Sequence, residues 1–385
     1  MLYVERAAGP GAIEKLASEW EKLEQSLQPR TPFTSPLWNT LWWKHFHIYS
    51  AWVRDELCVH TVRNEFEALI AVAPMMLTSR PAFGPFRVRA LQLLGADENV
   101  TELRSVISRP EDLPEVLATL SGYFRATSDR WDWLQWGGIP DNPASRELLG
   151  RGGRIQWGRV VPIYYLPLRE PWEDFRNHLS RNMKEALRKC YNSLKRAGHE
   201  FAFRVVSEPA QTAAALATFF ELHAERSLAA DLPAHANVFT RQPARDFLLE
   251  YGQRMAERDQ LRIFQLVIGG EVVATRVGFV LGNELYLYYS GYRLAWARHS
   301  VMTTVVAESI KWAIQQGLGG VNLSTGRDLS KLRWNPTEIV TCEGVQSSSR
   351  RLRQLAAGAY LHVAEHATPN SVLGRLLSSA RRAKP

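Results

Sequence analysis

The chain has 385 residues, of which 45% are hydrophobic and 22% are charged, and its formal net charge is +8. This composition excludes a disordered chain, a coiled coil and a collagen-like fibre, and the length predicts two or three domains. Three scattered cysteines, Cys58, Cys190 and Cys342, are too few for a disulfide framework and indicate a reducing compartment. Glu5 interrupts the segment where a signal peptide needs its apolar core, so we expect a cytoplasmic protein.

The first half of the sequence predicts two helices followed by a hairpin. Residues 13–27 have the spacing of an amphipathic helix, and a second helical run extends from Trp38 to Phe46. Residues 57–73 then predict two strands joined by a turn near Asn64.

The second half repeats this order of elements. Helical runs at 212–227 and 247–251 precede residues 261–277, which predict a hairpin with its turn at Gly269 and Gly270. The two hairpins align without a gap at an offset of 204 residues. A repeat of this length is explained most simply by two similarly folded domains with mixed α/β structure.

Between the halves, a predicted strand at 160–168 precedes an amphipathic helix. Ser180 is placed to cap the start of this helix, and Gly198 is placed to end it. One side of the helix is apolar, whereas residues 176–197 contain seven lysines and arginines against one glutamate. Such a basic surface attracts phosphate groups of any kind.

The C-terminal segment is also basic, with seven lysines and arginines against one glutamate in residues 350–385. Its apolar residues have helical spacing, so we expect weak attachment of this tail to anionic membranes at the inner face of the cell membrane. His362, Glu365 and His366 match a zinc-protease pattern, but no acidic residue follows that could supply a third ligand. We therefore predict no metal site.

The second half continues with a strand at 284–290, a helix at 301–316 and a strand at 319–323. Ser300 stands at the N-cap position of that helix. Backbone N–H groups at the start of a helix can hold a pyrophosphate. The aromatic strand before it can present its backbone groups to a bound acyl chain.

Five segments of the sequence resemble motifs of one superfamily. They are Pro32–Trp38 with Trp42 and Trp43, Leu179–Arg188, Phe219–Arg226, Ser290–Tyr292 with Ser300, and Gly326–Trp334. In these segments the chain resembles the GNAT superfamily of acyltransferases, and more narrowly its Fem-type and cellulose-biosynthesis-associated branch, which carries two GNAT domains in tandem. The resemblance covers about residues 1–345.

The resemblance implies an α/β fold with mixed sheets and two tandem GNAT-like domains. We place an N-terminal GNAT-like domain at 1–168, a C-terminal acyltransferase domain at 169–346 and a basic helical tail at 347–385. The sequence departs from the pattern in three places: Met302 stands where the family usually has Gly, Asn322 where it has Asp, and Ser330 where it has Tyr. Met302 narrows the space for a donor pyrophosphate, and the other two changes affect the acid–base assignment.

Candidate roles follow from the resemblance and from the chemistry of acyl transfer. The free amine must lose a proton, and His223 has the intrinsic pKa of a general base. Lys331 is expected to stabilise an oxyanion or to hold a donor phosphate, and Tyr289 is the third candidate catalytic residue. Alternation along a strand places Tyr288 and Tyr289 on opposite faces, one in the site and one in the core. Alternatively, His223 is a packed histidine at the domain seam and Lys331 a surface lysine.

The remaining candidates bind substrate or donor. Arg226, Tyr288 and Trp334 are the predicted substrate-binding residues, although Trp334 is also a natural packing residue. The donor is expected to lie against Ser300, Val301, Met302 and Thr303 at the start of the 301–316 helix.

The sequence thus predicts an N-acyltransferase that has no permanently bound cofactor and uses acyl-CoA, or an acyl carrier protein, as cosubstrate. Its acceptor is an amine or a hydroxyl, such as an amino-lipid, a sphingoid base or an exopolysaccharide precursor, and no DNA is involved. One alternative is a Fem-type transferase that uses aminoacyl-tRNA. Another is a non-catalytic partner in polysaccharide or lipid assembly.

Overall fold

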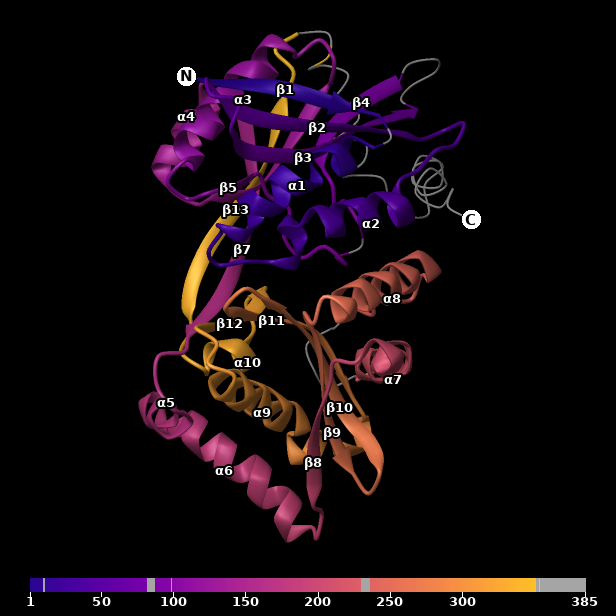
Figure 1. Cartoon of the computed structure of the whole chain (residues 1–385), viewed down its shortest axis with the longest axis vertical. Helices are drawn as coiled ribbons and strands as arrows, with labels where there is room; N and C mark the ends of the chain where they lie inside the picture. Colours follow the sequence, from indigo (N-terminus) through magenta and orange to yellow (C-terminus); the bar gives the residue numbers. More distant parts are fainter. Residues whose placement is uncertain (10, 82–86, 98, 230–235, 351–352, 354–385) are drawn as a thin grey trace.

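The computed structural model describes residues 1–9, 11–81, 87–97, 99–229, 236–350 and 353. Two halves lie one above the other, and a pair of long strands, β7 and β13, connects them along one side (Figure 1). The described strands form one sheet in the order β1-β2-β3-β4-β6-β13-β7-β12-β11-β10-β9-β8, with β5 paired to β3.

The N-terminal half contains two helices on each face of its part of the sheet. Its elements are β1 (Leu2–Ala8), α1 (Ala12–Gln25), α2 (Pro36–Phe46), β2 (Arg54–Asn64), β3 (Leu69–Pro81), β4 (Arg87–Leu93), β5 (Ile107–Ser108), α3 (Leu113–Ala126), β6 (Trp133–Pro140), α4 (Pro143–Gly150) and β7 (Ile155–Pro167).

The C-terminal half repeats this order after two helices of its own. Its elements are α5 (Trp172–His178), α6 (Arg181–Arg196), β8 (Phe201–Val206), α7 (Pro209–Ser227), α8 (Gln242–Glu257), β9 (Leu261–Ile268), β10 (Glu271–Leu281), β11 (Glu284–Tyr292), the 3-10 helix η2 (Leu294–His299), α9 (Val301–Gln315), β12 (Gly320–Thr325), α10 (Leu329–Leu332) and β13 (Thr337–Ser347).

The predicted repeat is confirmed strand by strand. The hairpin β2–β3 corresponds to β9–β10, and in each half the next strand pairs in parallel with the strand after its helix, β4 with β6 and β11 with β12. The last strands are exchanged, because β13 of the second half pairs with β6 while β7 of the first half pairs with β12. The two halves therefore share one sheet, and the boundary at residue 168 stays a prediction.

One core lies between the halves. Side chains from α1 and α2 pack with side chains from α7, α8 and β11 in a single cluster of buried residues that includes Trp38, Phe247 and Tyr288. Two further cores lie on the outer faces, under α3 in the first half and between α9 and α6 in the second. Each half thus has its sheet between two layers, and the inner layers pack against each other.

The local predictions for α6 and α9 have different outcomes. The hydroxyl of Ser180 accepts a hydrogen bond from the N–H of Met183 at 3.2 Å and caps α6 as predicted. Ser300 does occupy the N-cap position of α9, but its side chain makes no capping bond, which corrects the expectation. The physical reason is that η2 runs directly into α9 and leaves Ser300 in a left-handed conformation with φ of 54°.

Two expectations concern membranes and metals. Among the described residues, no helix is both long enough and apolar enough to cross a membrane. The basic tail beyond Arg353, and with it His362, Glu365 and His366, lies outside the described residues. The three cysteines are buried and carry free thiols.

Helix α7 approaches strand β11 so closely that only glycine fits at position 291. A Cβ atom added to Gly291 would lie 2.3 Å from the backbone nitrogen of His223. We predict that Gly291→Ala destabilises the protein by about 3 kcal/mol or more, because two backbones must separate. Thermal unfolding checks this, with Gly122→Ala as control, since a Cβ at Gly122 in α3 meets nothing within 4 Å. An unchanged melting temperature of Gly291→Ala would show that α7 is not held against β11.

Candidate functional site

The candidate site lies where β11 and β12 separate. The two strands pair in parallel only from Glu284 with Gly320 to Tyr286 with Asn322, although both strands continue beyond these residues. After Tyr286, β11 stays paired with β10 and β12 with β7. Where the strands have separated, backbone groups and side chains of both can contact a molecule bound between them.

A β-bulge in β11 changes the direction of its tyrosines. Two residues of β11, Tyr288 and Tyr289, lie opposite the single residue Val277 of β10, because the register shifts between Arg276 and Gly278. Both tyrosine side chains therefore face the core between the halves, with ring centroids 4.6 Å apart. The prediction that they point to opposite faces is wrong, since simple alternation holds only without a bulge.

Three tyrosines of β11 hold one loop of the N-terminal half. Tyr288 donates to the carbonyl of Val100 at 2.5 Å, and Tyr289 donates to the carbonyl of Asn99 at 2.7 Å. The side-chain amide of Asn99 donates back to the Tyr289 hydroxyl at 2.8 Å. Burial raises the pKa of Tyr289 far above its ordinary value, so the phenol keeps its proton. Tyr289 is thus placed as an anchor of this loop as well as beside the split.

Glu102, on the same loop, enters the split. Its carboxylate accepts a hydrogen bond of 2.5 Å from the hydroxyl of Tyr286, the last β11 residue paired with β12. Burial raises the pKa of Glu102, while the nearby Lys331 ammonium and the Tyr286 hydroxyl oppose that change. A carboxyl group from the first half is therefore held at the split by β11 of the second half.

Lys331 lies on α10, directly after β12. Its ammonium donates to the Ser324 hydroxyl at 3.1 Å, to the carbonyl of Thr325, and to the carbonyl of Gly326 at 3.4 Å. Burial lowers the pKa of Lys331 to about 8, although Glu102 raises it. The lysine is therefore a half-buried cation in the split and not an extended surface side chain.

Two arginines complete a cluster of cations around the split. Arg226 on α7 donates to the Ser290 hydroxyl at 2.7 Å, and Arg276 on β10 donates to the carbonyl of Leu287 at 3.2 Å. Burial lowers the pKa of Arg276 to about 10, and the charge of Arg226 adds to this effect. Within the part of the chain that the structure describes, no carboxylate oxygen lies within 4 Å of Arg226, Arg276 or Lys331.

His223 lies beneath this cluster and is fully buried. Its Nδ1 is 2.9 Å from the carbonyl of Ser290, which can only accept, so Nδ1 carries the proton. Burial lowers the pKa of His223 to about 4. The imidazole therefore lacks the ordinary pKa on which its assignment as a general base depended, and in this position it joins α7 to β11.

Trp334 is also buried, in the core between α9 and α6, as its alternative role as a packing residue predicts. Tyr288 likewise lies in the core between the halves. Of the predicted substrate-binding residues, Arg226 is the one that reaches the split with a charged group. The structure thus brings together Lys331 and Arg226 from the sequence prediction.

The predicted donor residues lie at the start of α9, beside the basic helix α6. Val301 is buried, and Met302 is half-buried against the core with its side chain turned inward. The ring of His299 joins the two helices: its Nδ1 donates to the Ser193 hydroxyl of α6 at 2.7 Å, and its Nε2 accepts from Arg298 at 3.0 Å.

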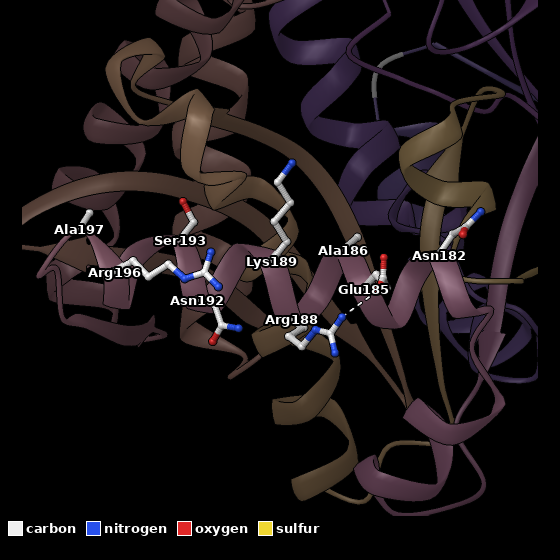
Figure 2. A pocket seen from close by; sticks show the side chains of 9 residues that line it. All are labelled: Asn182, Glu185, Ala186, Arg188, Lys189, Asn192, Ser193, Arg196 and Ala197. Carbon is white, nitrogen blue, oxygen red and sulfur yellow. Dashed lines mark hydrogen bonds and ion pairs between the residues drawn. The ribbon is translucent and has the colours of Figure 1, made fainter.

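A hollow of about 700 Å³ lies along α6 on the side that includes Ser193 (Figure 2). It is lined by Asn182, Glu185, Ala186, Arg188, Lys189, Asn192, Ser193, Arg196 and Ala197. Arg188 is paired with Glu185 at 2.7 Å, whereas Lys189 extends away from that pair. All the residues that line the hollow belong to α6 and its C-cap, and Ser193, which contacts His299 just before α9, is one of them.

The corresponding split in the first half is filled by the chain itself. Strands β4 and β6 pair only from Ala90 with Trp133 to Gln92 with Gln135. Beyond these pairs, Gly138 of β6 lies so close to the segment between β4 and β5 that a Cβ atom added to it would be 2.4 Å from the Cβ of Ser105. The split between β11 and β12 is thus the better candidate for a reaction site.

Sequence reasoning missed Glu102 and Arg276. Arg276 carried a signal, because a lone arginine in the apolar strand 272–281 must find a polar environment. Glu102 lies in a polar loop with no distinctive spacing, and only the docking of that loop onto β11 gives it a role.

Comparisons with known proteins agree with this geometry. Residues 181–331 match the family model described as "Acetyltransferase (GNAT) domain". No curated protein sequence matches the chain. The structure of FemX is similar, with a TM-score of 0.55 at 10% identity over 88% of this chain and 98% of FemX.

Two other solved structures have lower scores. A tandem GNAT protein from the clavulanic acid biosynthesis pathway has a TM-score of 0.46 at 9% identity, over 90% of this chain and 99% of that chain. L-PGS from Bacillus licheniformis has 0.45 at 13% identity, over 79% and 88%. The similarity to FemX extends over both halves and concerns the fold, which is that of two GNAT-like domains in tandem, and the GNAT family model matches residues 181–331 in the second half. The cellulose-biosynthesis-associated branch stays a prediction.

We predict that His223 remains neutral down to a pH near 4. Burial penalises the charged form of His223, so the folded protein binds this proton at a lower pH than the unfolded chain does. Because the unfolded chain binds more protons in this range, His223 lowers the stability of the fold as the pH falls from 6.5 towards 4. Nitrogen-15 NMR of the histidine side chains measures the midpoint and the Nδ1-protonated tautomer. Exposed His47 is the internal control. A midpoint of His223 near 6.5 would restore it as a candidate base.

Proposed function

We propose that the protein transfers an acyl group from acyl-CoA to an amine in the split between β11 and β12. One observation carries the proposal: a cation, Lys331, is hydrogen-bonded to Ser324 of β12, and a carboxyl group from the other half, Glu102, is hydrogen-bonded to Tyr286 of β11, so that each strand of the split holds one of the two groups. Acyl transfer needs a cation where negative charge develops and an acceptor for the amine proton. The match to a GNAT domain model over residues 181–331 supports this class of reaction.

The chemistry assigns a role to each group. Glu102 takes the proton from the ammonium form of the acceptor, and the neutral amine nitrogen then bonds to the thioester carbonyl carbon. The carbonyl electron pair moves to the oxygen. The Lys331 ammonium stabilises this oxyanion by donating to it in place of the carbonyl of Gly326, which is its longest hydrogen bond at 3.4 Å. When the oxyanion collapses, the carbon–sulfur bond breaks, and the leaving thiolate takes up the second proton that the nitrogen releases, so that an amide and a free thiol are formed.

The donor is proposed to extend from the split towards α6. Its pyrophosphate would lie at the start of α9, at Ser300 to Thr303, and its remaining phosphate near the basic hollow of α6. The half-buried Met302, whose side chain packs inward, supports this placement in spite of the missing glycine. The acceptor is proposed to be an amino-lipid or another small amine, with an anionic group near Arg226 and Arg276.

A second candidate donor is an aminoacyl-tRNA. The hollow along α6 carries Arg188, Lys189 and Arg196, which is more positive charge than one pyrophosphate requires. FemX has a similar fold, and its name is the one that the Fem-type alternative carries. The reaction in the split would be the same, with an ester replacing the thioester.

Thermal-shift titrations with acetyl-CoA, a long-chain acyl-CoA and charged tRNA decide between these donors. A donor at 100 times its Kd stabilises the fold by about 2.7 kcal/mol, which raises the melting temperature measurably. Stabilisation by an acyl-CoA supports the proposal, and stabilisation by charged tRNA alone supports the second candidate. No shift with any of them would favour the non-catalytic role.

We predict that Lys331→Ala lowers the rate of transfer by 100-fold or more, because the oxyanion loses about 3–4 kcal/mol of stabilisation. In the wild-type protein the rate should fall as the pH rises through about 8, where Lys331 loses its charge. Lys331→Arg should shift that loss to a higher pH, since a guanidinium stays protonated. Steady-state kinetics with the donor from the thermal-shift screen measures both effects. Normal turnover by Lys331→Ala at an unchanged melting temperature would show a structural role.

We predict that Glu102→Gln lowers kcat/KM at neutral pH and flattens the acidic limb of its pH profile. The amide keeps the shape of the side chain and can still accept the Tyr286 bond, but it cannot take a proton. The matched control is Glu56→Gln, an exposed carboxylate of the same half that pairs with Arg6. An acidic limb that survives in Glu102→Gln would assign the base elsewhere.

A further inference from the structure

A short turn between α2 and β2 presents two aromatic rings to solvent. Trp52 is 63% exposed and Tyr49 is 75% exposed, and both lie in residues 47–53. An exposed tryptophan gains nothing from folding, since its apolar surface stays in water. Two such rings in one turn of a monomeric structure point to a surface that is covered by a partner.

Hydrogen bonds within the turn fix the path of its backbone. The N–H of Ser50 donates to the carbonyl of Val53 at 2.8 Å, and the N–H of Val53 donates to the Ser50 hydroxyl at 3.0 Å. Asp55 closes the base of the turn by accepting from the N–H of Ile48 at 2.7 Å. Val53 is buried and anchors the turn. The backbone therefore holds Tyr49 and Trp52 outward in a fixed geometry.

Arginines surround the two rings. Arg54 lies over the ring of Tyr49, 5.4 Å from its centroid, and Arg87 on β4 donates to the carbonyl of Trp52 at 2.9 Å. Ser79, which pairs with Arg54 across β2 and β3, accepts a hydrogen bond from Arg87, so the two arginines lie on the same face of the sheet. Among the residues that the structure describes, neither of these arginines has a carboxylate oxygen within 4 Å. The neighbouring Glu56 is paired with Arg6 instead.

We propose that this surface, the turn 47–53 with Arg54 and Arg87, binds the headgroup region of an anionic membrane. Tryptophan and tyrosine rings prefer the interface between water and lipid, where an apolar ring and a polar edge are both satisfied. Unpaired arginines add attraction to anionic headgroups. The proposal is independent of the proposed function and of the expected attachment through the basic tail.

Shape and charge favour a membrane over a nucleic acid. Single-stranded nucleic acid binds in a basic groove where successive bases stack on aromatic rings. Here the rings stand on a single projecting turn between α2 and β2, and the ring of Tyr49 is already covered on one side by Arg54. A flat, negatively charged interface can contact both rings and the arginines at once.

The experiment places an environment-sensitive fluorophore on the turn. The three native cysteines are buried, so Ala51→Cys, an exposed position between the two rings, can be labelled selectively with a nitrobenzoxadiazole maleimide. The matched control is Phe66→Cys, because Phe66 is 81% exposed and lies in the turn at the other end of β2. Labelled full-length chains are titrated with phosphatidylcholine vesicles that contain or lack phosphatidylglycerol, and separately with a single-stranded RNA.

The proposal expects a blue shift and a brighter signal from position 51, and not from position 66, with phosphatidylglycerol vesicles only. Arg54→Ala should then weaken the partition coefficient about fivefold, and Trp52→Ala at least as much. Three results would overturn the proposal: no binding to vesicles, binding without a change at position 51, or a change at position 51 with RNA alone. Vesicle binding without a change at position 51 would assign attachment to another segment, such as the tail.

Discussion

The docking of residues 99–102 onto the tyrosines of β11 is the contact on which the rest of the structure depends. Tyr286, Tyr288 and Tyr289 each donate a hydrogen bond to this loop of the N-terminal half. They can do so together because the bulge in β11 turns Tyr288 and Tyr289 to the same side. Phe33, just before α2, and Trp38, in the first turns of α2, pack edge-on against the rings of Tyr286 and Tyr288, which extends the contact into the common core.

This contact explains why charged groups are found in the middle of the molecule. Docking carries Glu102 into the split, where it compensates part of the positive charge of Lys331 and Arg276. Burial of ions is costly, and the cost is reduced when opposite charges share the site. The excess of cations that remains is a natural complement to an anionic donor or to an oxyanion. The second half supplies the three cations and Asp328, and Glu102 is the carboxyl group that the first half adds.

The exchange of β7 and β13 reinforces this arrangement. Strand β7 of the first half pairs with β12 of the second half, and β13 of the second half pairs with β6 of the first half. The two halves therefore form one sheet. The two halves therefore contain two corresponding splits. The split between β4 and β6 is filled by residues of the same half, beside Gly138. The split between β11 and β12 is completed by a loop from the other half.

The elements that carry strong local signals could be predicted from the sequence. The helix that Ser180 caps and the hairpin that turns at Gly269 and Gly270 were both predicted, because capping and turn chemistry are local. The directions of Tyr288 and Tyr289 could not be predicted, since the bulge depends on pairing with β10.

The same distinction applies to the site. Lys331 and Arg226 were found from their motifs, and their residue types have the charge that the chemistry needs. Burial, which a sequence does not state, lowers the pKa of His223 below the ordinary value on which its assignment was based, and its role as a base stays a prediction. Glu102 became visible only when two distant segments were brought together.

A crystal structure with a non-hydrolysable thioester analogue of the donor identified by thermal shift tests the central claim most directly. The account predicts that the carbonyl group lies in the split between β11 and β12, with its oxygen towards Lys331 and with Glu102 on the acceptor side. A donor bound in the first half beside Gly138, or a thioester held outside the split with Lys331 and Glu102 out of reach, would contradict it.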